Sequence, residues 1–159
     1  MITTILVVLV ILYFVRKIYT EIASSSNPLA AGEHLRDATI VQGKFTPKTL
    51  AKYNGRDSDR IFISVKNRVY DVTQGAAFYG PGGPYENFAG RDASRGLALN
   101  SFDPAVLTPL DQPIDDLKNL SKIELESLES WDEHFENRYK IVGTLHENGT
   151  VKEEDEKSL

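Results

Sequence analysis

Two phenols on either side of a glycine-rich turn are the side chains in this sequence best placed to do chemistry. The stretch Phe78–Asp103 reads FYGPGGPYENFAGRDASRGLALNSFD and holds Tyr79 just before the turn and Tyr85 just after it. Glycine at three of the five turn positions lets the backbone approach something flat and bulky without a Cβ in the way. Two prolines stiffen the same turn. We therefore predict that this stretch forms the wall of a binding pocket.

The composition excludes several other kinds of site. The 159 residues contain no cysteine, which excludes disulfides, thiolate metal sites and a cysteine nucleophile. The formal net charge of −5 argues against a nucleic-acid partner, because the chain has no basic surface to neutralise phosphates. Charged residues make up 26% of the chain and hydrophobic residues 41%, which is typical of one soluble domain with appendages.

The N-terminal run MITTILVVLVILYFV is uncharged and almost entirely apolar. Arg16 and Lys17 follow this run and do not precede it, which favours an uncleaved membrane anchor over residues 1–19 against a cleaved signal peptide. The same two charges predict a single-pass protein whose C-terminal domain faces the cytosol. Residues 20–43 show no sustained periodicity and are expected to be a flexible linker.

Local patterns downstream of the linker predict one small α+β domain over residues 44–146. The expected elements are a helix from Thr46-Pro47, a hairpin of strands 61–65 and 69–72, a short element 73–78, a helix from Asp92, a loop 108–116, a helix from Ser121 and a strand 141–145. The helix starts are predicted by N-cap residues, and Ser121 also forms a capping box with Glu124. Residues 147–159 are expected to be an acidic disordered tail.

Apolar spacing predicts which side chains of the two later helices face the core. The expected core positions are Leu97, Leu99 and Phe102 for the first of them, and Ile123, Leu128, Trp131 and Phe135 for the second. The rest of the longer helix is mostly carboxylate. That face is either simply solvated or docks a basic partner surface.

The runs IFISVKNRVYDVTQG and FYGPGGPYENFAGRDASRGLA resemble the cytochrome b5-like haem/steroid-binding domain. More closely, they are similar to the membrane-associated progesterone receptor family and its fungal damage-resistance members. The similarity covers about residues 44–146. It implies a cytochrome b5-like α+β fold, non-covalently bound haem b and a single N-terminal transmembrane helix.

The resemblance also implies which residues serve the haem. Cytochrome b5 itself presents a histidine in a His-Pro-Gly-Gly motif, whereas Pro81–Gly83 has no histidine beside it. In the family, the residue matching Tyr85 is the single axial ligand of the iron, and Tyr139 is the alternative. The residues matching Tyr79, Arg138 and Tyr139 line the haem, and Asp92 supports its retention, as a helix cap.

A phenol must lose its proton to bind iron well, and ferric iron and a nearby cation both favour the anion. Arg138 and Lys140 flank Tyr139 and could supply that cation. A hard anionic ligand stabilises ferric over ferrous iron, so such a haem is better suited to sensing, delivery or docking than to electron transfer. Without the surrounding motif, Tyr79 and Tyr85 would be read as ordinary half-buried aromatics.

The resemblance implies a regulatory protein of the endoplasmic reticulum membrane, with no catalytic residues. Such proteins associate with microsomal cytochrome P-450 enzymes, notably the lanosterol demethylase of sterol (ergosterol) biosynthesis, and fungal members confer damage resistance. Two alternatives stay open, a b5-type electron carrier and a steroid-binding membrane receptor. A haem with one exposed face would also permit a haem-dependent homodimer.

Overall fold

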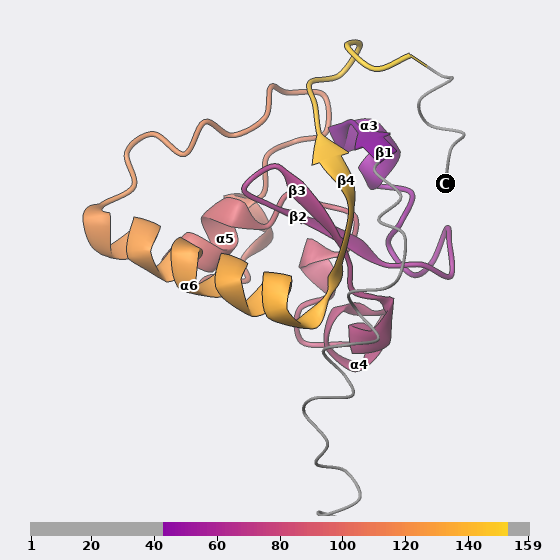
Figure 1. The fold of residues 1–159 in the computed structure, drawn as a ribbon, viewed down its shortest axis with the longest axis horizontal. Helices are drawn as coiled ribbons and strands as arrows, with labels where there is room; N and C mark the ends of the chain where they lie inside the picture. Colours follow the sequence, from indigo (N-terminus) through magenta and orange to yellow (C-terminus); the bar gives the residue numbers. More distant parts are fainter. Residues whose placement is uncertain (1–42, 153–159) are drawn as a thin grey trace, which may run out of the picture. The chain divides into compact units, whose positions relative to one another are not determined.

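The computed structural model describes residues 43–152 of the chain, so the predicted anchor and nearly all of the predicted linker lie outside the described residues. Figure 1 shows the described elements in chain order. The strands are β1 (Gly43–Phe45), β2 (Phe62–Val65), β3 (Arg68–Asp71) and β4 (Lys140–Leu145). The α-helices are α3 (Pro47–Leu50), α4 (Ala76–Tyr79), α5 (Ser94–Leu99) and α6 (Lys122–Arg138), and the 3₁₀ turns are η1 (Thr73–Gly75), η2 (Glu86–Phe88) and η3 (Pro104–Val106).

The four strands form one mixed sheet in the order β1-β4-β3-β2. β2 and β3 are the predicted hairpin, and its turn residues Lys66 and Asn67 have φ of +51° and +62°. Two consecutive positive φ values are what a type I′ hairpin turn requires. β4 lies antiparallel to β3 and parallel to β1. Strand β1 was not predicted, because its three residues pair with residues 100 positions later in the chain.

Both faces of this sheet carry a hydrophobic core. Successive residues of β2 point to opposite faces, as the period of a strand demands. Ile63 belongs to the core that also holds Tyr70, Tyr79, Phe88, Leu128 and Phe135. Phe62 belongs to a second core with Phe45, Leu50, Val69, Val142 and Leu145. We call these the helix-side core and the strap-side core, since α6 packs into the first and the loop 108–115 crosses the second.

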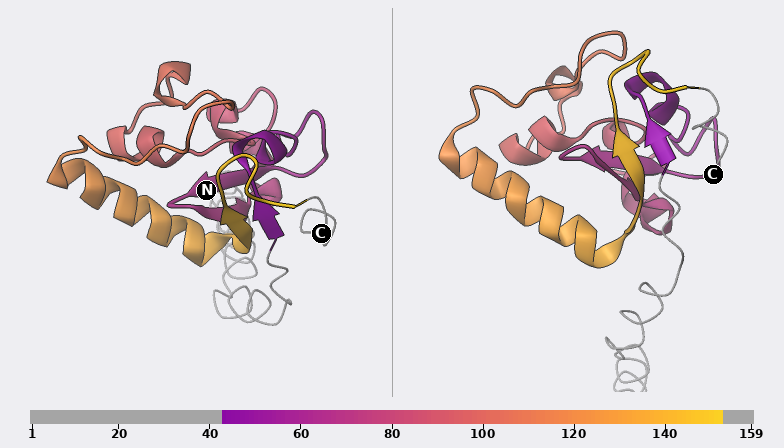
Figure 2. Two further views of the ribbon diagram at one scale, coloured as in Figure 1. Left: turned by 90° about the horizontal axis from the view of Figure 1, so that it is seen from above. Right: turned by 45° about the horizontal axis from the view of Figure 1, so that its top comes forward.

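Helix α6 begins at the predicted capping box, in which the Ser121 hydroxyl accepts from the Glu124 N–H and the Glu124 carboxylate accepts from the Ser121 N–H. The helix runs directly into β4, as Figures 1 and 2 show. Leu128 and Phe135 are buried as predicted, whereas Ile123 is 77% exposed. The prediction for Ile123 was wrong because five residues on a helix separate it from Leu128 by about 140°.

The core assignment of the preceding helix was wrong at two positions. Leu97 is buried in α5, but Leu99 and Phe102 are each 38% exposed. Two residues on a helix lie about 200° apart, so Leu97 and Leu99 cannot share one face. Phe102 lies beyond the helix, which ends at Asn100 in the left-handed conformation.

Candidate functional site

The glycine turn folds back on α4 and brings the two phenols of the motif together. The Gly80 N–H donates to the Ala76 carbonyl, and the Tyr85 N–H donates to the Phe78 carbonyl at 2.9 Å. A Cβ at Gly83 would lie 2.4 Å from the Phe78 carbonyl oxygen, so that position admits no side chain. This return places Tyr85 beside the residues that end α4, and the pocket wall expected of this turn stays a prediction.

Tyr139, which directly follows α6, completes a cluster of three phenols. The ring centroid of Tyr79 lies 5.9 Å from that of Tyr85 and 6.4 Å from that of Tyr139. Phe135 packs against both Tyr79 and Tyr139, with centroid distances of 5.9 and 5.6 Å. The structure therefore brings together Tyr79, Tyr85 and Tyr139, which come from three separate segments. We call these three residues the phenol cluster.

The three members of the cluster differ in exposure. Tyr79 is only 6% exposed, whereas Tyr85 and Tyr139 are half-buried. Burial raises the pKa of Tyr79, the neighbouring Tyr139 and Tyr85 raise it further, and the Arg138 guanidinium lowers it. Ionising the buried Tyr79 would therefore be costly, and on exposure the two half-buried phenols are the better candidates for an anionic ligand.

The hydroxyls of the phenol cluster are not used by the scaffold. None of the three makes a hydrogen bond to another residue within 43–152. Gly75 lets two of these phenols pack closely against its backbone, because a Cβ there would lie 2.8 Å from the Tyr139 Oη and 3.1 Å from a ring carbon of Tyr79. Three hard oxygen donors that no residue of this described region engages are a donor set that suits ferric iron.

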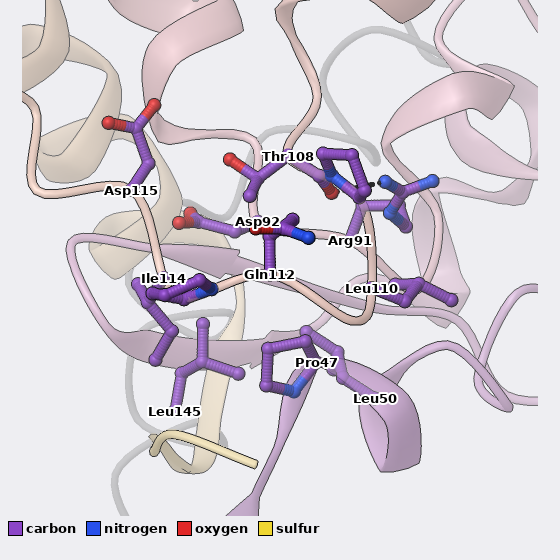
Figure 3. Close-up of a pocket in the computed structure, with 12 residues that line it drawn as sticks. Pro47, Leu50, Arg91, Asp92, Thr108, Leu110, Gln112, Ile114, Asp115 and Leu145 are labelled. Atoms are coloured by element: carbon purple, nitrogen blue, oxygen red, sulfur yellow. Dashed lines mark hydrogen bonds between the residues drawn. The ribbon is translucent and has the colours of Figure 1, made fainter.

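Arg138 and Asp92 were both predicted to serve this site, and the structure places them differently. Arg138 is the exposed last residue of α6, next to Tyr139, and its charge acts on Tyr79. Asp92 instead lines a small cavity on the strap side of the sheet, beside Leu50 and Ile114 of the strap-side core (Figure 3). It is therefore not a member of the phenol cluster.

The carboxylate of Asp92 organises the start of α5 without being its formal N-cap, which is Ala93. Its Oδ1 accepts from the Ser94 N–H at 3.2 Å and from the Ser94 hydroxyl at 2.6 Å. The Ser94 hydroxyl oxygen in turn accepts from the Lys66 N–H in the hairpin turn. Burial raises the pKa of Asp92. Any role of Asp92 at the phenol cluster must therefore act through the position of α5.

Two residues that matter to the site were missed from the sequence. The ring centroid of Phe102 lies 4.5 Å from that of Tyr85. The Phe78 ring stacks on Tyr85 with a centroid distance of 6.4 Å. Phe78 was read only as part of the motif, and Phe102 was assigned to the core. The number of aromatic residues within Phe78–Asp103 was the signal in the sequence that could have indicated these ring contacts.

The described histidines have other surroundings. His134 packs edge-on against Trp131 and Phe135, and burial together with Arg138 lowers its pKa. His146 lies within 2.7 Å of the Thr144 hydroxyl, just after β4. Neither ring contacts a ring of the phenol cluster, and His34 lies outside the described residues.

Comparison with known proteins gives matches over this same region. The family described as cytochrome b5-like heme/steroid binding domain matches residues 46–145. The chain is 45% identical over 102 residues to cytochrome P450 regulator dap1 of Schizosaccharomyces pombe, covering 64% of this chain and 61% of the relative. It is 42% identical over 122 residues to membrane-associated progesterone receptor component 2 of Rattus norvegicus, covering 75% and 55%. A solved Arabidopsis thaliana structure with a cytochrome b5 like fold is 37% identical, with a TM-score of 0.58, covering 69% of this chain and 95% of that one.

The similarity has a defined extent. This chain spans about three fifths or less of the length of the first curated relatives. Within residues 43–152, no helix is both long and apolar enough to cross a membrane. The family match nevertheless covers most of the described residues and both faces of the sheet. The chain therefore belongs to the cytochrome b5-like haem/steroid-binding domain family, and its relatives place it with the membrane-associated progesterone receptor proteins.

Proposed function

We propose that this chain binds haem b through the phenolate of Tyr85 and that, in this form, it supports a membrane-bound cytochrome P-450. The observation that carries the proposal is the phenol cluster, whose three hydroxyls have no hydrogen-bond partner among residues 43–152. Bound haem would supply an iron centre that a single anionic oxygen ligand holds in the ferric state.

The residues of the cluster would have separate tasks. Tyr85 is half-buried and would give up its proton, while the buried Tyr79 would stay neutral because its pKa is raised. Tyr139 would line the haem, and Arg138 would favour negative charge nearby. Tyr139 is the alternative ligand, since it is also half-buried and lies next to the same cation.

Hemin titration into the purified chain tests the ligand. We expect the wild-type protein to give a high-spin ferric spectrum that resists mild reductants, and the variant Tyr85→Phe to lose that spectrum and to bind hemin more weakly. Tyr139→Phe should weaken binding but keep the spectrum. Tyr53→Phe is the matched control, because Tyr53 stacks on Phe62 on the strap side of the sheet.

The same experiment separates the rival functions. A b5-type electron carrier would show the sharp low-spin spectrum of two strong ligands and would be reduced readily. A steroid-binding receptor would bind progesterone equally well with and without haem, and Tyr85→Phe would not change its affinity. If Tyr139→Phe, and not Tyr85→Phe, removes the high-spin spectrum, the iron ligand is Tyr139.

We propose a P-450 partner because the relative in Schizosaccharomyces pombe is named as a cytochrome P450 regulator. The lanosterol demethylase of sterol (ergosterol) biosynthesis is the partner that the family resemblance implies, together with a role in damage resistance. Adding the full chain to microsomes that contain this enzyme should raise its demethylation rate, and the Tyr85→Phe chain should not. An equal rate with both chains would contradict a haem-dependent role.

The membrane placement is part of the proposal. An anchor over residues 1–19 would hold the domain on the cytosolic side of the endoplasmic reticulum membrane. The two glycosylation sequons begin at Asn119 and Asn148, and a cytosolic domain leaves both bare. Glycan on either asparagine in cells would contradict this topology. The Asn148 side-chain amide also donates to the Leu110 carbonyl at 2.7 Å.

A haem-dependent homodimer is also proposed, because a haem held by a single protein ligand would be available to contact a second copy of the chain. Light scattering of the apo and haem-loaded chain tests this. A doubled mass on loading is expected, and equal masses would contradict it.

A further inference from the structure

Phe102 makes the shortest ring contact of Tyr85, although it belongs to neither the motif turn nor the core. The centroids of the two rings are 4.5 Å apart, and the ring planes are inclined by 33°. The other two ring neighbours of Tyr85 are Tyr79 at 5.9 Å and Phe78 at 6.4 Å. Offset aromatic pairs in this distance range are attractive beyond their buried area.

Polar contacts hold the backbone that carries the exposed Phe102 ring. The Asn87 side-chain amide donates to the Phe102 carbonyl at 2.9 Å. Two residues earlier, Asn100 ends α5 in the left-handed conformation, with φ of +49°. The next N–H, of Ser101, donates to the Gly96 carbonyl at 2.9 Å. The Phe102 ring itself is 38% exposed and packs on the buried ring of Phe88, with a centroid distance of 5.6 Å.

Asn100 also connects this segment to α6. Its Oδ1 accepts from the Trp131 indole N–H at 3.1 Å, and its Nδ2 donates to the Ser127 hydroxyl at 3.2 Å. Helix α6 leads into Tyr139, which belongs to the phenol cluster. The segment that carries Phe102 is therefore fixed both to the turn that holds Tyr85 and to the helix that leads to Tyr139.

We propose that Phe102 is a positioning residue for the phenol of Tyr85 and so determines how that oxygen is presented to haem iron. This inference rests on the proposed function, in which Tyr85 is the ligand. A tyrosine side chain rotates about two torsion angles, and its phenol oxygen is the atom farthest from the backbone, so it moves most when they change. Contact with a neighbouring ring restricts this rotation, whereas Phe102 itself donates nothing to the iron. Phe78 contacts Tyr85 less closely and is more exposed, so we assign it a smaller effect.

The test compares Phe102→Leu with Phe102→Tyr, and uses Leu99→Ala as the matched control. Leu99 has the same exposed fraction as Phe102, lies three residues away and has no place in the ring contacts of Tyr85. In the haem-free protein, NMR should show that Phe102→Leu shifts the Tyr85 ring protons by removing a ring current, while Leu99→Ala leaves them in place. In the haem-loaded protein, Phe102→Leu should change the ferric EPR signal and speed haem dissociation about three- to tenfold, the size expected from one aromatic pair. Phe102→Tyr should restore both.

Each outcome decides the inference. If Phe102→Leu behaves like Leu99→Ala in the EPR signal and the dissociation rate, Phe102 has no positioning role, whatever its effect on the NMR spectrum. Phe102→Leu could also lose haem while its EPR signal stays unchanged and its melting temperature falls strongly. That result would indicate a merely structural role and would also overturn the inference. The ligand assignment fails separately, when Tyr85→Phe leaves the haem spectrum unchanged. A changed spectrum in Tyr85→Phe with no effect of Phe102→Leu overturns this inference alone.

Discussion

Gly75→Ala tests the packing of the phenol cluster, because it adds a methyl group to the backbone against which Tyr79 and Tyr139 pack. Gly75 has φ of −93° and ψ of +24°, which alanine can also adopt, so the change adds one methyl group without straining the backbone. The new Cβ would lie 2.8 Å from the Tyr139 Oη and 3.1 Å from a ring carbon of Tyr79. The first contact is too short for any Cβ, so the Tyr139 side chain must move, and the second is tight, so the Tyr79 ring must shift by a few tenths of an ångström.

Burial decides which of the two rings moves further. Tyr79 is buried and has four neighbouring aromatic rings, whereas the Tyr139 oxygen is the far end of a half-buried side chain. Overpacking costs about 1–3 kcal/mol, and the low end applies where a side-chain end can shift. Alanine also lowers the entropy of the unfolded chain, which returns about 0.4–1 kcal/mol. We expect a net loss of roughly 1 kcal/mol or less in the free energy of unfolding of the haem-free protein.

Urea unfolding and hemin titration measure the two consequences. With Tyr85 as the ligand, Gly75→Ala should weaken hemin binding less than tenfold and leave the ferric spectrum unchanged. With Tyr139 as the ligand, the displaced oxygen should change the spectrum itself. The double variant Gly75→Ala/Tyr139→Phe removes the oxygen that the methyl group meets most closely, so Gly75→Ala should cost less stability in the Tyr139→Phe background than in the wild type. An equal or larger cost in the Tyr139→Phe background would refute the steric account of this wall.

Two further predictions concern side chains away from the phenol cluster. Asp92 has a pKa raised above its ordinary 3.8 by burial, so its contribution to stability falls as pH rises from about 3.8 through the folded-state value. In urea unfolding at a series of pH values, we expect Asp92→Asn to reduce this loss of stability with rising pH. We expect Asp92→Ala to lower the free energy of unfolding by about 1–2 kcal/mol, because the Ser94 N–H and hydroxyl lose their acceptor. The buried Asp132 accepts hydrogen bonds from Arg68 and from the Tyr70 hydroxyl. We expect Asp132→Ala to lower the free energy of unfolding by about 3–5 kcal/mol and Tyr70→Phe to lower it by about 1 kcal/mol. A lower urea midpoint for Tyr70→Phe than for Asp132→Ala would contradict this.

The elements that were predictable from the sequence are those set by local chemistry. Thr46 caps α3 through the Thr49 N–H, and Ser121 caps α6 together with Glu124. The hairpin turn needs two residues that tolerate positive φ, and Asn67 is one of the residue types that do so readily. Each of these signals lies within a few residues of the feature that it predicts.

The features that could not be predicted depend on partners far along the chain. Strand β1 exists because Gly43–Phe45 pairs with Gly143–Leu145, and three residues carry too little pattern to be recognised as a strand. Glu147 and Asn148 lie in the predicted tail, yet they bond to the backbone of Ile114 and Leu110 in the loop that crosses the strap side. The placement of Asp92 on that side is also set by tertiary pairing, since the backbone of residues 90–93 runs beside β2.

The phenol cluster was predictable only in part. Resemblance to a family identified Tyr79, Tyr85 and Tyr139, but the sequence alone says nothing of how close a residue near position 80 lies to one near position 139. They meet because α4 and the end of α6 both pack on the helix side of the sheet, where Phe135 contacts two of them. The contact of Phe102 with Tyr85 could not be predicted although the two residues are close in sequence. Apolar spacing cannot distinguish an aromatic ring that fills a core from one that supports a neighbouring phenol.

The helix-side core contains a fourth tyrosine, and the comparison shows why only three are candidate ligands. Tyr70 lies fully buried in the same core and packs against Phe135 at 5.6 Å. Its hydroxyl, however, donates to the buried carboxylate of Asp132, which ties α6 to the hairpin. Burial and that hydrogen bond raise the pKa of Tyr70. Because its proton is held in a structural contact, Tyr70 cannot become an anionic ligand without losing the tie between helix and sheet, whereas the hydroxyls of the phenol cluster have no such task among residues 43–152.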